Sequence, residues 1–133
     1  MADGVVVDAS ALNKKIQSIE SKAKNPRIEM AKVKTVMYQD VMNHFKKEQG
    51  EKRPWKSIDY RKGKILQDTG RLRASIRPSS DNTSATVGTN LDYAATHNYG
   101  RGSIPQRKFM WLSKEAIDSI KRRIGRFVVS SVV

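Results

Sequence analysis

The stretch LRASIRPSSDNTSATV, residues 72–87, decides the fold class expected for this chain. At its start three apolar residues alternate with three polar ones, namely Leu72, Ala74 and Ile76 with Arg73, Ser75 and Arg77. Residues 79–82 have turn-forming side chains, and Ala85 and Val87 then resume the two-residue period. The pattern predicts a β-hairpin with one buried face.

The polar face of this predicted hairpin is positively charged. In strand register Arg71, Arg73 and Arg77 fall on the face opposite Leu72 and Ile76. We therefore expect a positive stripe that water, DNA or an acidic subunit could cover.

Two helices are expected before the hairpin. Leu12, Ile16 and Ile19 recur at helical spacing and predict a first helix over residues 10–24, which follows a strand-like apolar run at residues 5–7. Asn25 and Pro26 then supply a cap residue and a proline at the first helical position. An apolar residue recurs every three or four positions after them, which predicts a long helix ending near residue 50: Met30, Val33, Met37, Val41 and Phe45.

The downstream half is expected to return the chain to the core. Residues 93–99 predict a short helix closed by Gly100, and residues 100–107 a Gly/Pro loop. Residues 109–112 look like a short buried strand, and Ser113 can cap a last helix. The tail, residues 128–133, is β-prone and could fray or add a strand to a neighbour.

These elements predict an α+β fold, in which a small antiparallel β-sheet carries a long N-terminal helical region and a C-terminal helix packed on it. We expect a single domain over residues 1–133, with a helical part (1–50), a basic loop (51–64), a hairpin, short helix and strand (65–112), and a last helix and tail (113–133). A sheet of few strands has edges that must be covered, which points to an oligomer.

Charge identifies the expected contact region. Lys and Arg number 26 against 13 Asp and Glu, for a formal net charge of +13. Such an excess favours polyanions or acidic protein surfaces. Eleven basic and four acidic residues lie between Lys46 and Arg77, so we expect a partner to meet this stretch.

The basic loop supplies most of the candidate contact residues, which face DNA or a partner: Lys52, Arg53, Lys56, Arg61, Lys62 and Lys64, with Arg71, Arg73 and Arg77 beyond it. Trp55 and Tyr60 add aromatic rings, and cations with aromatics are the pairing that holds nucleic-acid backbones and stacks bases. The alternative is a solvated basic loop with one aromatic anchored in the core. In the last helix we attribute the cations at residues 121–126 to the helix dipole.

Catalytic and metal chemistry find little support. The chain has no cysteine, which fits a reducing compartment, and residues 1–9 resemble neither a signal peptide nor a membrane span. His44, expected on the polar flank of the long helix, and His97 lie apart without metal-like spacing. A nuclease built on Asp68, Asp81 and Asp92 is a weak alternative, because their spacing matches no ligand loop. We expect no enzyme activity, no cofactor and no metal.

Three ordered blocks carry a family resemblance. They read ILQDTGRLRASI at residues 65–76, VGTNLDYAATHNYG at residues 87–100 and IPQRKF at residues 104–109. They resemble the phage virion morphogenesis, or tail-completion, family, with its pattern L-x-x-[ST]-G-x-L-x-x-S-I, then V-G-[ST]-x-x-x-Y-A-x-x-H-x-x-G, then P-x-R-x-F. Lys108 departs from relatives that often carry proline there, which affects the rigidity of the loop.

The resemblance implies a structural virion protein of a tailed phage, assembled in the host cytoplasm into a homo-oligomeric, sixfold ring. The ring would complete the tail or join it to the head, contact other neck, connector and tail-tube proteins, and let DNA pass. The same blocks supply candidate architectural residues: Trp55, Gly70, Gly88, Tyr93, Gly100, Pro105 and Phe109. Of these, Tyr93, together with Tyr99 and Gly100, would pack the short helix against the sheet. The alternative function is a stand-alone basic DNA-binding protein.

Overall fold

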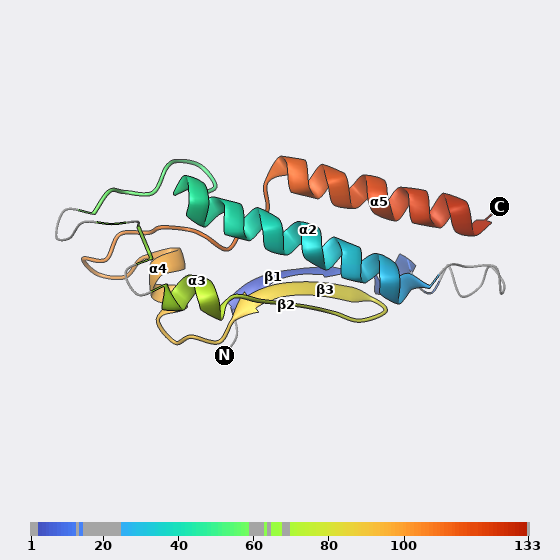
Figure 1. Ribbon diagram of the computed structural model, residues 1–133, viewed down its shortest axis with the longest axis horizontal. Helices are drawn as coiled ribbons and strands as arrows, with labels where there is room; N and C mark the ends of the chain where they lie inside the picture. Colours follow the sequence, from blue (N-terminus) through green and yellow to red (C-terminus); the bar gives the residue numbers. More distant parts are fainter. Residues whose placement is uncertain are drawn as a thin grey trace.

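The structure, a computed structural model, describes residues 3–12, 14, 25–58, 63, 65–67 and 70–132. Its elements follow in chain order: β1 (Asp3–Asp8), α2 (Pro26–Lys47), α3 (Arg71–Ser75), β2 (Arg77–Ser80), β3 (Ser84–Thr89), α4 (Ala94–Tyr99) and α5 (Lys114–Val132). Figure 1 shows three layers, with α2 between the sheet and α5. The α+β fold class is confirmed, and α5 is joined to the sheet through α2.

Three antiparallel strands form the sheet in the order β1-β3-β2. Val87 of the central strand pairs with Val5 of β1 and with Pro78 of β2. The predicted hairpin turn is present, because the Asp81 carboxylate accepts hydrogen bonds from the Thr83 and Ser84 N–H groups, each at 2.8 Å. The strand-like run at residues 5–7 lies in β1, one of the two edge strands of the sheet.

The predicted first strand of the hairpin is wrong at its start, because residues 71–75 form a helix. Gly70 begins it with φ of +73°, and the Ala74 N–H donates to the Gly70 carbonyl at 2.9 Å. Leu72 and Ile76 are buried whereas Ala74 is exposed. The apolar residues that suggested a two-residue period therefore satisfy the four-residue spacing of a helix equally well.

The expected positive stripe is lost with that strand. Arg73 donates to the Gln67 side chain at 3.0 Å, and Arg77 donates to the carbonyls of Ala74 and Ile76. Arg71 lies exposed on α3. The three arginines thus lie on α3 and at the start of β2, where Arg73 and Arg77 donate hydrogen bonds to nearby side-chain and backbone oxygens.

The long helix α2 is built as predicted. The Asn25 side chain accepts a hydrogen bond from the Arg27 N–H at 3.0 Å, and Pro26 occupies the first turn. Its apolar positions are buried: Met30, Val33, Met37, Val41 and Phe45. The helix ends at Lys47, where Glu48 turns left-handed with φ of 53°. Of the predicted helix over residues 10–24, positions 10–12 and 14 are helical and the rest lies outside the described residues.

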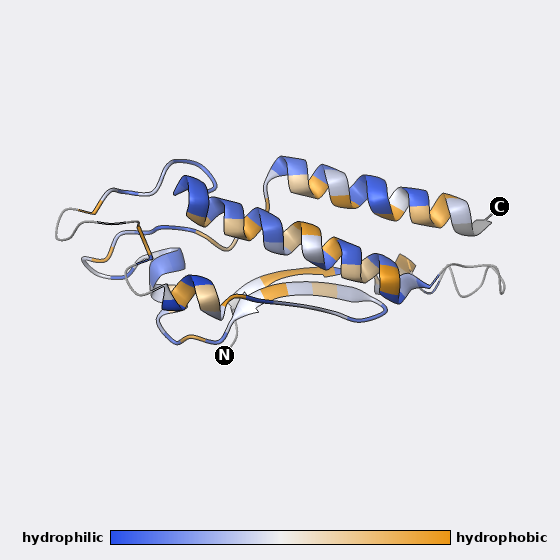
Figure 2. Cartoon of the chain, in the orientation of Figure 1, coloured by the Kyte–Doolittle hydropathy of each residue, from blue (hydrophilic) through white to orange (hydrophobic). Residues whose placement is uncertain are grey.

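The last helix, α5, packs along α2. Its cap is confirmed, since the Ser113 hydroxyl accepts a hydrogen bond from the Ala116 N–H at 3.1 Å. Figure 2 shows apolar positions of α5 on the side turned toward α2 and hydrophilic ones on the other side. The helix continues to Val132, so the expectation of a β-prone tail is wrong: buried Phe127 holds the last turns on the core.

A polar cluster fixes the start of α5 on α2. The Asp40 carboxylate accepts hydrogen bonds from the Ser113 N–H (2.8 Å) and hydroxyl (2.6 Å). His44 stacks on Trp111 with ring centroids 3.8 Å apart, and its Nε2 lies 2.9 Å from the Trp111 carbonyl oxygen. His44 is therefore buried, and its predicted place on a polar flank is wrong. Residues 109–112 form no strand, because polar side chains bind their backbone where a strand partner would.

Candidate partner-binding surface

A tight turn follows α2 and presents the first part of the predicted basic loop, residues 50–56, which we call the basic turn. The Gly50 N–H donates to the Arg53 carbonyl at 2.9 Å, and the Trp55 N–H donates to the Glu48 carbonyl at 2.9 Å. A Cβ on Gly50 would lie 2.7 Å from the Arg53 carbonyl oxygen, so the turn requires glycine there. Between these bonds Lys52 and Arg53 are exposed.

Trp55 anchors the basic turn in the core. Its side chain is 6% exposed, and its ring meets the edge of Phe45 with centroids 5.5 Å apart. The indole N–H donates to the Lys108 carbonyl at 2.8 Å. The interpretation that one aromatic is anchored in the core is thus confirmed for Trp55, since a buried indole has no face open to a base. Tyr60, the other aromatic, lies outside the described residues.

Arg107 fastens the far end of the basic turn, a role that the sequence analysis did not assign. It is 5% exposed, and its guanidinium donates to the carbonyls of Lys56 (2.8 Å) and Ser57 (3.2 Å). Along the extended residues 105–110, here called the return segment, Arg107 and Phe109 are buried and Gln106 is exposed. The arginine of the P-x-R-x-F pattern was the available signal.

Asn98 of α4 holds the return segment from the other side. It is 1% exposed, and its side-chain oxygen accepts the N–H groups of Phe109 and Met110, each at 3.0 Å. The Arg107 N–H donates to the His97 carbonyl at 2.8 Å. One amide side chain therefore does for two backbone groups what a neighbouring strand does in a sheet.

His97 lies beside this junction. Burial, followed by the positive charge of Arg107, holds the pKa of His97 below its ordinary value. Tyr93 meets its ring edge-on with centroids 5.9 Å apart. Tyr93 and Tyr99 are themselves 38% and 59% exposed, so the expectation that they pack α4 against the sheet is wrong, and Ala94 and Asn98 are the buried residues of this helix.

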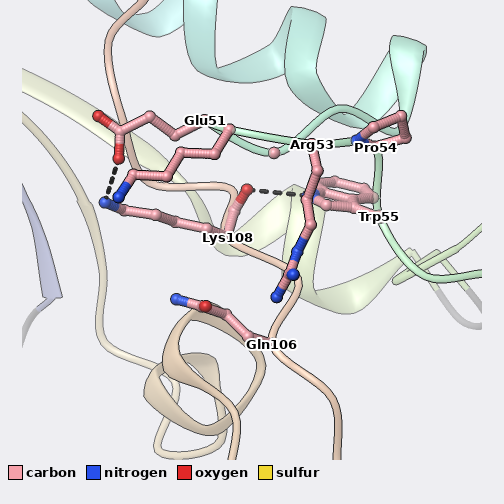
Figure 3. Close-up of a pocket in the computed structure, with 8 residues that line it drawn as sticks. Glu51, Arg53, Pro54, Trp55, Gln106 and Lys108 are labelled. Atoms are coloured by element: carbon pink, nitrogen blue, oxygen red, sulfur yellow. Dashed lines mark hydrogen bonds and ion pairs between the residues drawn. The ribbon is translucent and has the colours of Figure 1, made fainter.

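The basic turn and the return segment enclose an open cleft of about 390 Å³ (Figure 3). The Lys108 ammonium lies 2.6 Å from the Glu51 carboxylate, and this hydrogen bond holds the pKa of Glu51 below its ordinary value. The Arg53 guanidinium extends into the cleft above Gln106 (Figure 3). The cleft therefore offers guanidinium, ammonium and amide donors beside the Glu51 carboxylate, and its excess of cations suits an anionic group.

The candidate contact residues separate into two places. Lys52, Arg53 and Lys56 are exposed on the basic turn, while Arg71, Arg73 and Arg77 belong to α3 and the start of β2. The two sets thus belong to different parts of the fold. The remaining candidates, Arg61, Lys62 and Lys64, lie outside the described residues.

The candidate architectural glycines occupy demanding positions. Gly88 pairs with Gly4 across the sheet, where a Cβ on Gly4 would lie 2.9 Å from the Gly88 Cα. Gly100 ends α4 with φ of +80°, and a Cβ there would lie 2.9 Å from the Gln106 nitrogen. Pro105 is half-buried in the return segment beside it.

Within the described part of the chain, no group of three His, Asp or Glu side chains is placed to hold a metal ion. Asp81 serves the hairpin turn, Asp92 is exposed, and Asp68 lies outside the described residues. Among the same residues no helix combines the length and apolar character that crossing a bilayer demands.

Comparisons with known proteins agree with the three motif blocks. The model of the phage virion morphogenesis family matches residues 7–128. The "Mu-like prophage FluMu G protein 2" of Haemophilus influenzae is 41% identical over 75 residues, covering 51% of this chain and 54% of that protein. The chain thus spans about half the length of this curated relative. No solved structure gives a significant match. Because the family match extends over most of the chain, this protein belongs to the phage virion morphogenesis family.

Proposed function

We propose that this protein forms a closed ring of six subunits that completes the phage tail or joins it to the head, with genome DNA passing through the centre. The sixfold number follows the family resemblance. The observation that carries the proposal is the cationic basic turn, fastened by Trp55 and Arg107 and held outward without a covering element among the described residues. A rigid, charged projection suits docking onto another subunit.

The sheet supplies a second surface for a neighbour. β1 pairs with β3 on one side, and no described strand lies on its other side. Val6 of β1 is 59% exposed. On the opposite edge, β2 contains Pro78, and a proline has no N–H to donate to another strand. β1 is therefore the edge suited to receive a strand from a neighbouring chain.

Two different surfaces on one subunit are what a ring requires. A heterologous contact, in which one surface meets a different surface of the next copy, closes into a ring when its rotation divides the circle. The basic turn lies near one end of the molecule, and β1 lies nearer its middle (Figure 1). In this ring Lys52, Arg53 and Lys56 face DNA in the lumen or an acidic neighbour.

Native mass spectrometry and negative-stain microscopy of the purified protein, alone and with tail-tube protein, test the ring. We expect ring particles, or rings that appear when the tail-tube protein is added. A Lys52→Glu/Arg53→Glu variant should lose them, while Lys32→Glu/Lys34→Glu, with the same change in net charge in the first half of α2, should keep them. A protein that stays monomeric and never joins tails would contradict the proposal.

A stand-alone DNA-binding protein is the second candidate, favoured by the net charge of +13. With Trp55 buried, binding through this part of the surface would rest on phosphate contacts and would weaken steeply with salt. Titration of duplex DNA at low and high salt separates the two functions. No binding at low salt would remove the second candidate.

A further inference from the structure

The outer face of α5 is a separate surface with its own charge pattern. Ala116, Ile120 and Phe127 are buried against the core. At 100° per residue, Asp118, Gly125 and Val129 fall on the opposite side of the helix. Val129 is 65% exposed, and nothing lies within 4 Å of the Cβ position of Gly125.

Charge changes sign along this face. After Lys114 at its start, the first part of α5 has Glu115 and Asp118, and outward cations follow in the second part: Lys121, Arg122 and Arg126. The helix dipole explains the acidic start, because negative charge is favoured near a helix N-terminus. It does not explain the cations as the sequence had suggested, since the helix runs on to Val132 and its last turn has no basic residue.

These outer charges make no ion pairs with one another among the described residues. No ion pair joins Asp118 to Lys121 or Arg122 in the described structure, although a spacing of three or four residues permits one. Arg123 is different, because it points toward α2 and its Nη1 lies 3.5 Å from the Glu29 carboxylate. The outer charges are thus left to solvent or to another molecule.

The fold of the subunit does not require glycine at position 125. Glycine in a helix interior lowers helix stability by roughly 1 kcal/mol relative to alanine. Its φ is not left-handed, and a Cβ there would meet open space. A glycine in the middle of an exposed, charged helix face lets another backbone or side chain approach closely.

We propose that a second copy of this chain docks on this face, with the two α5 helices antiparallel. An antiparallel copy reverses the order of charges, so Asp118 of each copy lies beside Arg122 of the other. Glu115 then lies beside Arg126, and its side chain crosses the helix at Gly125, where the missing Cβ leaves room. Both contacts occur twice because the arrangement is two-fold symmetric.

The observations favour a second copy over duplex DNA. Phosphates would be attracted by Arg122 and Arg126 but repelled by Glu115 and Asp118, two turns earlier on the same face. Val129, 65% exposed, also suits a protein surface better than a phosphate backbone. A partner with the opposite charge order pairs these two acidic residues and two arginines, and the chain itself has that order.

This contact is independent of the proposed ring. A two-fold contact uses the same surface on both partners, so it closes at two and cannot propagate around a ring. It joins two free subunits, or two rings face to face. Because one helix pair buries little area, the association should be weak and sensitive to salt.

Sedimentation velocity and native mass spectrometry at low salt, over a series of protein concentrations, test the contact. We expect the assembling unit, subunit or ring, to double in mass as concentration rises. Arg122→Glu/Arg126→Glu and Glu115→Lys/Asp118→Lys should each weaken the doubling by at least about tenfold. The control Lys46→Glu/Lys47→Glu, which matches the charge change of the arginine variant, should retain it.

Mixing the two charge variants is the decisive measurement. At residues 115, 118, 122 and 126 one variant is all-acidic and the other all-basic, so together they should form a mixed pair more stable than the wild-type pair. Gly125→Leu should abolish doubling while circular dichroism shows α5 intact. Wild-type protein that never doubles, doubling that survives the charge variants, or a mixture that forms no mixed pair would overturn the proposal. So would loss of duplex DNA binding as the charge variants' sole effect.

Discussion

The two halves of this molecule are held together by different forces. Around α2 and the sheet, apolar side chains from regular elements fill the core, among them Val33, Met37, Val41 and Val87, each with no exposed surface. Around α4 and the return segment, three buried polar or amphipathic side chains hold irregular backbone: Trp55, Asn98 and Arg107. Phe45 and Phe109, with centroids 5.4 Å apart, join the halves.

The difference follows from what each backbone can do for itself. A helix or a sheet satisfies its own N–H and C=O groups, so its side chains are free to be apolar. The return segment has no strand beside it, so its buried N–H groups need acceptors from side chains. The surface proposed to meet partners is therefore positioned by a few specific hydrogen bonds.

Removing the joint between the halves should have the largest effect. Phe45→Ala leaves a cavity against Trp55 and Phe109 and should lower the free energy of unfolding by about 3–5 kcal/mol. Chemical denaturation measures this value. A loss below that of a Val41→Ala variant, whose smaller side chain lies within the apolar half, would show that the two halves fold without this contact.

Asn98→Ala tests the polar half directly. The change leaves the Phe109 and Met110 N–H groups buried without an acceptor, so we expect a loss of roughly 2–4 kcal/mol in denaturation. Gln106→Ala is the control, because Gln106 is exposed and donates to the Asn98 carbonyl from outside the core, and it should cost under about 0.5 kcal/mol. Equal losses would refute the role given to the Asn98 side-chain oxygen.

Arg107→Met keeps much of the side-chain volume and removes the donors to Lys56 and Ser57. We expect a loss of about 1.5–3 kcal/mol, because the bonds come from a charged group. Hydrogen exchange should show faster exchange in the basic turn, with α2 unchanged. Equally faster exchange over the whole chain would mean that Arg107 supports only the global stability and does not hold the basic turn.

Asp40 makes the helical half sensitive to acid. Burial alone would raise its pKa, but the hydrogen bonds from His44 and Ser113 together outweigh burial, and the pKa lies below the ordinary 3.8. The carboxylate therefore adds stability above pH 3.8, and that stability is lost as pH falls through the lower folded value, by at most about 1.4 kcal/mol per pH unit. Between about pH 5 and about pH 2, the free energy of unfolding of an Asp40→Asn variant should therefore fall less than that of the wild type. The same fall in both proteins would contradict this role of Asp40.

His97 gives the polar half a smaller dependence at milder pH. Its pKa lies below the ordinary 6.5, so the unfolded chain binds the proton more readily than the folded chain. Stability is complete above pH 6.5 and falls as pH drops toward the folded value. Denaturation midpoints of His97→Gln should therefore vary less than those of the wild type just below pH 6.5. A wild-type curve that rises on acidification there would reverse the sign.

Sequence reasoning succeeded where side chains follow a regular period. The spacing of Met30 through Phe45 predicted α2, the cap at Ser113 predicted α5, and Asp81 marked the hairpin turn. It failed at residues 71–75, where Leu72 and Ile76 fit two periods at once, and Gly70 together with burial decided between them. It also failed at residues 109–112, since an apolar run does not show whether a strand or a side-chain amide satisfies its backbone.

The amino-acid sequence by itself determined the fold class, the family and the cationic character of the basic turn, because periodicity, turn chemistry and net charge are local or additive properties. The tertiary structure alone decided what these side chains contact. It placed Arg71, Arg73 and Arg77 on α3 and the start of β2, buried His44 and Trp55, and made Arg107 the support of the basic turn and Asn98 that of the return segment. The physical reason is that a side chain's role depends on which distant backbone groups it must satisfy, and only the folded chain brings those groups within hydrogen-bonding distance.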